Sequence, residues 1–307
     1  MTPADTDTKP TGAAGLSQAE WLGRLSDIGR SHGFFERIGA EHLALFVQES
    51  DILLVSFDRA ARVYAEEASG LPLGFEMVQR KEWSLLSIQS LSDSWFRASD
   101  LVAFFDSLAA SGFFESFTQV IFLGFGPACG HAACAYSSAA PGAAVLSSAP
   151  AATLDPERAG FDRRFRRDRK RDFSRYGDAP ALVAGASEVV ILYDPTDAAS
   201  GAHAAQFRGP QVALAPLRFT GPAPHRLVAD GGLLVLLLRA LSNRRLTRAR
   251  VAALVRPIRR TDATYLWRLA RIAQSHGQFD RARRVAEYAA DVTGEDRFTE
   301  LAESLAS

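Results

Sequence analysis

The 307-residue sequence predicts an α/β fold, with a mainly parallel sheet covered by helices on both faces and an all-helical C-terminal extension. Short apolar runs, typical of buried strands, alternate with segments of helical periodicity between residues 52 and 241. After residue 245 the pattern is helical throughout. The hydrophobic fraction of 47% is large enough to fill a core and excludes wholesale disorder.

The strands are expected at the short apolar runs, and the helices at the periodic segments between them. The strand candidates are 52–57, 85–88, 120–123, 144–146, 189–193 and 212–219, the last interrupted by Pro216. The helix candidates are 17–33, capped by Ser17, 100–112, capped by Asp100, and then 130–140, 199–207 and 227–241. Strand, crossover helix and strand in succession are the pattern of a parallel sheet.

Three zones follow from composition and periodicity. Residues 1–16 lack periodicity and are expected to form a disordered leader. Residues 17–244 form the α/β domain, and residues 245–307 form the helical extension.

Composition also excludes several classes of protein. Cys129 and Cys134 are the only cysteines, too few for a disulfide scaffold. The longest apolar run, residues 233–238, is too short to cross a bilayer, and Asp5 and Asp7 replace the basic start of a secretory signal. Neither a phosphate-binding loop motif nor a set of residues spaced for zinc is present. We therefore expect a cytoplasmic protein without a cofactor or a metal.

A glycine-rich turn follows the apolar run 120–123. The stretch from Gly124 to Gly130 contains three glycines and leads into a segment rich in small residues. Strand and helix can meet closely only where bulky side chains are absent. This turn resembles the nucleophile elbow of the α/β-hydrolase superfamily, in which a serine sits on a strained strand-to-helix turn.

The order of later residues extends the resemblance over residues 50–242. Asp194 and Asp197 follow a later strand, where the family keeps its acid, and His225 follows the last one, where the family keeps its histidine. The family pattern Gly-x-Ser-x-Gly is not intact, however. Its best-spaced match, 126–130, has Ala128 in the middle, and other alignments place Gly126 or Pro127 there. None of these side chains is a nucleophile, so the chain resembles a degenerate member.

Two functions are compatible with this departure. The leading interpretation is a non-catalytic scaffold or binding protein that keeps the fold and has lost the chemistry. The alternative is an atypical cysteine-dependent hydrolase or acyltransferase. In it, Cys129 at the start of a helix is the nucleophile, His225 is the base, and Asp197 or Asp194 orients the base. Backbone N–H groups around Gly126 and Gly130 would stabilise an oxyanion. The residue type favours the alternative, in which Cys129 is a small buried packing residue.

Two further stretches suggest ligands. The segment 93–97 resembles an Asn/Asp-x-Trp-Tyr segment of bacterial hydrolase-like proteins linked to polysaccharide modification, which would make Trp95 a sugar platform and links the function to polysaccharide or cell-surface glycans. Core packing is the alternative for Trp95.

The run 163–171 is a candidate anion-binding face, through Arg163, Arg164, Arg166 and Arg167. The acids interleaved with it favour a self-paired linker, and the absence of a nucleic-acid module argues against nucleic acid as the partner.

The C-terminal helices resemble a single tetratricopeptide repeat. Small residues at Ala270, Gly277, Ala282 and Ala289 would let two antiparallel helices approach closely, which implies a protein partner, although a plain helical hairpin is the alternative. The N-terminal half also resembles alphaproteobacterial chains described as phosphoadenosine phosphosulfate reductases. The Ser-Gly-Gly-type loop and the Glu-Cys-Gly-type cysteine of that enzyme class are missing here, so we expect no such activity.

Overall fold

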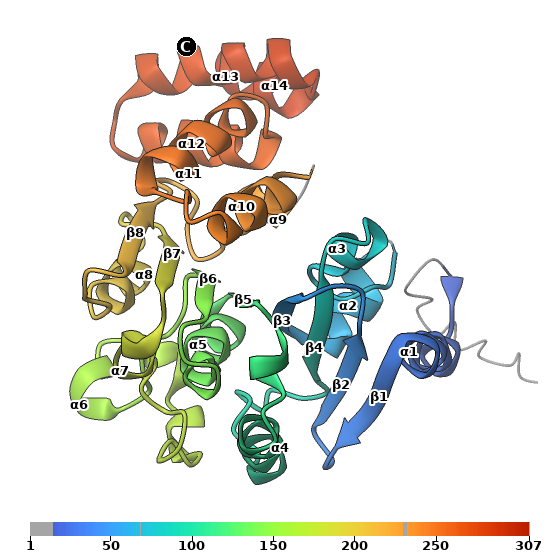
Figure 1. The fold of residues 1–307 in the computed structure, drawn as a ribbon. Coiled ribbons are helices and arrows are strands. Elements are labelled where there is room, and N and C mark those ends of the chain that lie inside the picture. The colour runs from blue at the N-terminus through green and yellow to red at the C-terminus, as the bar shows by residue number, and fades with distance from the viewer. Residues whose placement is uncertain (1–14, 68, 230–231, 307) are drawn as a thin grey trace, which may run out of the picture. The chain divides into compact units, whose positions relative to one another are not determined.

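The structure, a computed structural model of the chain, describes residues 15–67, 69–229 and 232–306 (Figure 1). The chain divides into two compact units, residues 1–123 and residues 124–307. The predicted disordered leader lies outside the described residues, except for Gly15 and Leu16. The predicted boundary at residue 245 falls inside the second unit, in the turn before a helix.

The first unit contains four strands in the order β1-β2-β4-β3. Strands β3 and β4 are parallel, whereas β1 pairs with β2 and β2 with β4 in antiparallel fashion. Strands β3 and β4 were predicted from the sequence. Strands β1 and β2 were missed, because a hairpin of two short runs lacks the strand–helix alternation on which the prediction rested. The bounds are β1 (Gly33–Ile38), β2 (His42–Val47), β3 (Ile52–Arg59) and β4 (Ser84–Ser90).

Helices and aromatic packing complete the first unit. A capping box starts α1, because the Ser17 hydroxyl accepts from the Glu20 N–H and the Glu20 carboxylate accepts from the Ser17 N–H. Helix α4 is capped at Ala98, so the prediction that Asp100 caps it is wrong; Asp100 lies in the first turn, where its charge suits the helix dipole. The helices are α1 (Gln18–His32), α2 (Ala60–Glu66), α3 (Phe75–Gln79) and α4 (Ser99–Ala110), with a 3₁₀ turn at Phe114–Ser116.

The second unit contains the strands β6, β7 and β8, paired in that order and all parallel. Strand β5 (Gln119–Phe125) runs across residue 123, where the two units meet in the sequence. The buried residues of β6 and β7, such as Leu146 and Val190, are opposite one another in the pairing and form the centre of this core. The predicted α/β fold with mainly parallel pairing is confirmed. The bounds are β6 (Ala144–Ser148), β7 (Glu188–Tyr193) and β8 (Val212–Pro216).

Short helices connect these strands, and two helix predictions need correction. Helix α5 begins at Pro127 rather than near residue 130, because proline suits the first turn of a helix. The single helix expected at 227–241 is two helices, with Gly232 in a left-handed conformation (φ 74°) before the second. The helices are α5 (Pro127–Tyr136), α6 (Pro156–Ala159), α7 (Ala179–Leu182), α8 (Ala198–Ala204), α9 (Arg226–Ala229) and α10 (Leu233–Ser242), with 3₁₀ turns at Ser137–Ala139, Arg163–Phe165, Asp168–Lys170 and Val183–Gly185.

Four further helices, orange to red in Figure 1, make up the rest of the second unit and confirm the all-helical prediction. Small residues allow close packing here: Ala270, Ala286 and Ala289 are fully buried in the contacts among these helices. Within the described ranges, no helix has both the length and the apolar character that a bilayer crossing requires. The bounds are α11 (Arg248–Arg259), α12 (Ala263–Ser275), α13 (Phe279–Thr293) and α14 (Asp296–Ser304).

Candidate functional site at the strand ends of the second unit

The turn between β5 and α5 is centred on Gly126. Its φ of 86° is left-handed, a conformation that favours glycine. The Gly126 N–H donates to the Ser148 carbonyl at 2.8 Å, and the Gly126 carbonyl accepts from the Gly130 N–H at 2.8 Å. Gly126 therefore occupies the strained position between strand and helix.

This geometry corrects the alignment to the family pattern. Ala128, the middle residue of the best-spaced match, lies inside α5, while Gly126 lies on the turn. Of the three alignments, the one centred on Gly126 is the one whose middle residue lies on the turn. Gly124 is needed for close packing, since a Cβ there would lie 2.1 Å from the Cys129 carbonyl oxygen. A Cβ at Gly126, in contrast, would meet no atom within 4 Å.

Both cysteines belong to α5 and are buried. Cys129 lies in the first turn and is 7% exposed, which leaves little of the side chain open to a substrate. Burial raises the pKa of Cys134 to about 12, so this thiol stays protonated. Gly130 serves packing, because a Cβ there would lie 2.7 Å from the Ser147 hydroxyl oxygen.

Asp194 follows β7 directly and is fully buried. One carboxylate oxygen, Oδ2, accepts from the Gly221 N–H at 2.6 Å. The other, Oδ1, accepts from the N–H and the hydroxyl of Thr196 at 2.8 and 2.6 Å. The Gly221 contact ties Asp194 to the loop that carries His225.

His225 lies in that loop, between β8 and α9, and is partly buried. Its ring stacks on Phe125, with centroids 5.4 Å apart and an interplanar angle of 17°. Phe125 directly precedes Gly126. The structure thus brings the His225 ring beside the β5 turn, and brings Asp194 to the loop that holds the ring. Carboxyl ends of parallel strands are where α/β proteins place their ligand and catalytic sites.

Asp197 has a local role. It precedes α8, and its side chain accepts from the Ser200 N–H at 2.8 Å, which is a helix N-cap. The Asp197 carboxylate therefore caps α8. Asp194, rather than Asp197, is the acid that contacts the loop of His225.

Trp95 lies in the core of the first unit. It is only 5% exposed and has a left-handed φ of 55°, and the neighbouring Phe96 packs edge-on against Phe57 at 5.3 Å. A buried ring offers no open face to a pyranose, so the predicted sugar platform at Trp95 is wrong. Core packing, the alternative, is what the structure shows.

The arginine run is exposed and partly self-paired. Arg163, Arg164, Arg166 and Arg167 are exposed, but the Arg164 guanidinium donates to the buried Asp162 carboxylate at 2.7 Å. Arg169 donates to the backbone carbonyls of Ala159 and Asp162. Part of the positive charge of this segment is therefore already hydrogen-bonded to acceptors within the segment.

Two buried histidine pairs were not predicted. The Ala152 N–H donates to Nδ1 of His203, so the ring proton is on Nε2, which donates to Asp162 at 3.1 Å. In the first unit, Nε2 of His42 lies 2.7 Å from the Ser94 hydroxyl, with both residues fully buried. These residues come from segments 41 and 52 positions apart, and no sequence pattern connects them.

The pKa shifts of the two histidines come mainly from burial. Burial lowers the pKa of His42 to about 4 and also lowers the pKa of His203, although the bond to Asp162 opposes the latter. Burial acts to raise the pKa of Asp162, but hydrogen bonds from Arg164 and His203 outweigh it and lower the pKa to about 2. Among the residues that the structure describes, no group of three or more histidine, cysteine or acidic side chains is placed to hold a metal ion.

Comparisons with known proteins give structural similarity only. No family model and no curated protein matches this chain. Among solved structures, it is similar to acetyl xylan esterase 1 from Thermoanaerobacterium sp. (13% identity, 76% of this chain and 96% of that one, TM-score 0.45). It is also similar to a carboxylesterase from Lactobacillus plantarum (16%, 69% and 97%, TM-score 0.44). A third is the capsule O-acetyltransferase of Neisseria meningitidis serogroup A (9%, 69% and 93%, TM-score 0.41).

Proposed function

We propose that this chain is a non-catalytic binding or scaffold protein built on an α/β-hydrolase-like fold. The observation that carries the proposal is Gly126, which occupies the strained strand-to-helix turn where the resemblance to the family requires a serine. The order of the other site residues supports the hydrolase-like part of the proposal, since Asp194 and His225 follow β7 and β8. In this proposal, loss of the serine side chain alone removes the nucleophile, and Asp194 and His225 are remnants of the acid and the base.

The cysteine-dependent hydrolase or acyltransferase is the second candidate. Cys129 lies in the first turn of a helix, where the dipole favours a thiolate. Against it stand the 7% exposure of Cys129 and its position three residues beyond Gly126. The Gly124 contact also holds the Cys129 backbone against the strand.

An ester-hydrolysis assay with p-nitrophenyl acetate separates the two candidates. We expect wild-type turnover equal to that of buffer, and no change in Cys129→Ala or His225→Gln. Turnover above the buffer rate that disappears in both variants, and persists in Cys134→Ala, would establish the cysteine enzyme instead.

A serine placed on the turn tests the register of the degenerate elbow. We expect Gly126→Ser to gain slow ester hydrolysis that His225→Gln abolishes again, because the new Cβ points into open space beside the Phe125–His225 stack. The left-handed φ should cost the variant about 1–2 kcal/mol of stability. Ala128→Ser is the matched control, expected to gain nothing from inside α5. A gain in Ala128→Ser alone would contradict the register.

Two finer points stay predictions. A protein partner at the C-terminal helices is supported by α13, which exposes Phe279, Tyr288 and Val292. The tetratricopeptide resemblance of α12 and α13 belongs to the same prediction.

A link to polysaccharide or cell-surface glycan modification no longer has Trp95 to support it. Isothermal titration with neutral and acidic oligosaccharides checks it, and Trp95→Phe should leave any binding unchanged.

A further inference from the structure

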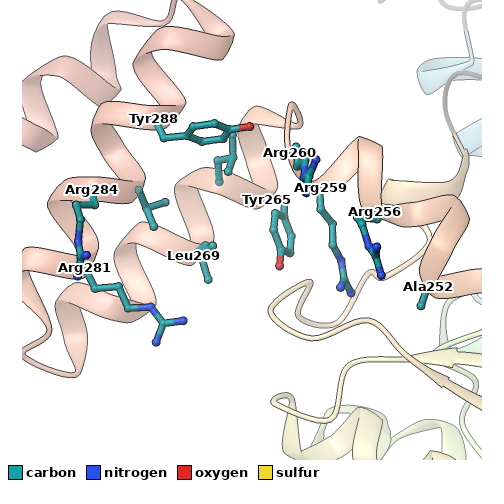
Figure 2. Close-up of a pocket in the computed structure, with 11 residues that line it drawn as sticks. Ala252, Arg256, Arg259, Arg260, Tyr265, Leu269, Arg281, Arg284 and Tyr288 are labelled. Atoms are coloured by element: carbon teal, nitrogen blue, oxygen red, sulfur yellow. The ribbon is translucent and has the colours of Figure 1, made fainter. Parts of the chain in front are cut away.

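A cavity of about 860 Å³ lies among α11, α12 and α13, remote in sequence from the Gly126 turn (Figure 2). We call it the arginine pocket, because five arginines line it: Arg256, Arg259, Arg260, Arg281 and Arg284. Its size is in the range of small-molecule sites, which are usually 300–1,000 Å³. The first two arginines lie on α11, Arg260 follows that helix directly, and the last two lie on α13.

None of the described residues that line the pocket is acidic. Over the described ranges, no salt bridge joins any of the five guanidiniums to a carboxylate. The contacts that they do make are weak and local: Arg281 donates to the Gln278 side chain at 3.4 Å, and Arg284 to the Asp280 carbonyl at 3.3 Å. Like charges around one cavity repel, so this arrangement favours an anionic ligand.

Arg259 is the group that most needs a partner. Its Nε and Nη2 atoms are buried and make no hydrogen bond to a described residue, while its guanidinium lies 5.4 Å from the centre of the Tyr265 ring. A buried donor without an acceptor is costly, and guanidinium groups are good donors to phosphate oxygens. In Figure 2, the charged ends of Arg256, Arg259 and Arg281 extend to the same side as the Tyr265 hydroxyl.

The remaining walls are apolar or aromatic. Tyr265 and Tyr288 contribute rings, and Leu266, Leu269 and Val285 contribute aliphatic surface. A lone inorganic anion would leave these walls unused. A ligand with several negative charges at one end and a flat ring at the other would use both the arginines and the tyrosines.

We propose that the arginine pocket binds a small phosphorylated ligand of the nucleoside polyphosphate class. The phosphates contact the arginines of α11 and α13, and the ring system packs on Tyr265. This inference goes beyond the proposed function and does not depend on it, since the pocket shares no residue with the Gly126 turn.

Isothermal titration of the full chain with ADP and with inorganic pyrophosphate tests the proposal. We expect ADP to bind at one site per chain, with an affinity that falls as salt is raised. Arg259→Gln and Arg281→Gln should each weaken ADP about tenfold, the effect of losing one charged hydrogen-bonding group. Tyr265→Leu should weaken ADP and leave pyrophosphate binding within about twofold, because only ADP carries a ring to stack.

Two arginines outside the pocket provide matched controls. Arg283 lies on α13 but pairs with Glu287 at 3.2 Å, and Arg166 is exposed in the run 163–171. Neither Arg283→Gln nor Arg166→Gln should change ADP binding. Circular dichroism of each variant confirms that it is folded.

Three outcomes would overturn the proposal. One is no ADP binding at millimolar concentration. Another is a loss of binding in the Arg166 or Arg283 control equal to that in Arg259→Gln, which would show non-specific attraction to positive charge. The third is a glutamate-rich peptide that binds more tightly than ADP and displaces it, which would make the pocket a docking site for an acidic protein segment.

Discussion

The run 163–171 and the arginine pocket are both rich in arginine but differ in what surrounds the charge. In the run, Arg164 bonds to Asp162 at 2.7 Å, and Arg171 lies 3.5 Å from Asp168. In the pocket, described residues supply no salt bridge to any guanidinium. A dense run of arginines therefore does not by itself indicate a binding surface when aspartates lie between the arginines and pair with them. Arginines that are distant in sequence can bind an anion when the helices that carry them bring no acidic side chain close to them.

The largest expected effect is at Asp162. Asp162→Ala removes the acceptor of both Arg164 and His203 from a carboxylate that is 3% exposed. We expect a loss of about 1–3 kcal/mol in the free energy of unfolding, the cost of leaving the buried Nε2–H of His203 without an acceptor. Urea denaturation of the full chain measures it.

Asp168→Ala is the control for that experiment. Its pair with Arg171 is longer and partly exposed, so the expected loss is at most about 1 kcal/mol. Equal losses in the two variants would mean that Asp162 contributes no more than an ordinary surface acid. The pairing of Arg164 with Asp162 would then no longer distinguish the run 163–171 from the arginine pocket.

The second effect is a loss of stability in acid. The pKa of His203 is lowered by burial, so the unfolded chain takes up its proton near pH 6.5 while the folded chain stays neutral, and stability falls below that pH. The pKa of Asp162 is lowered to about 2, so its contribution is full above the ordinary value of about 4 and is lost as pH falls toward 2. Urea midpoints measured from pH 7 to pH 3 should decline.

Asp162→Ala should make the decline below pH 4 shallower and leave the decline between pH 6.5 and pH 4 in place, because burial still lowers the pKa of His203. The pKa of His42 is about 4 through burial, so His42 contributes a separate loss between pH 6.5 and pH 4. The double variant His203→Gln/His42→Gln should be nearly flat over that window. An unchanged pH slope in both variants would contradict the assignment to these groups.

The smallest expected effect is in the arginine pocket. Arg281→Gln and Arg284→Gln should each change the free energy of unfolding by less than about 0.5 kcal/mol, because both side chains are exposed and neither has a salt bridge to lose. Thermal denaturation without ligand measures this. A loss of 2 kcal/mol or more would show that these arginines stabilise the fold. The arginines of the pocket would then be structural, as Arg164 is in the run 163–171, and not free for a ligand.

The sequence was informative where chemistry is local. The helix cap at Ser17 and the apolar runs of β3, β5 and β7 were predicted because each is specified by adjacent residues. The hairpin of β1 and β2 was missed, since short apolar runs do not by themselves distinguish strand from helix. At the candidate site, Asp194 was predicted to follow a strand directly and His225 to lie in a loop after the last strand, and both do. Which residue occupies the strained turn was not decided, because three alignments of the glycine-rich stretch were compatible with its spacing.

What the sequence determined by itself is the α/β class, the helical C-terminal region and the absence of a serine in the glycine-rich turn, because periodicity and composition are properties of neighbouring residues. Tertiary structure alone decided that Gly126 is the residue on the turn, that Asp194 rather than Asp197 holds the loop of His225, and that Trp95 is core. It alone gathered arginines of α11 and α13 around one cavity. The burial of a side chain and its distance from an oppositely charged group depend on how separate segments pack. Together they determine whether the charge of that side chain is free to bind a ligand.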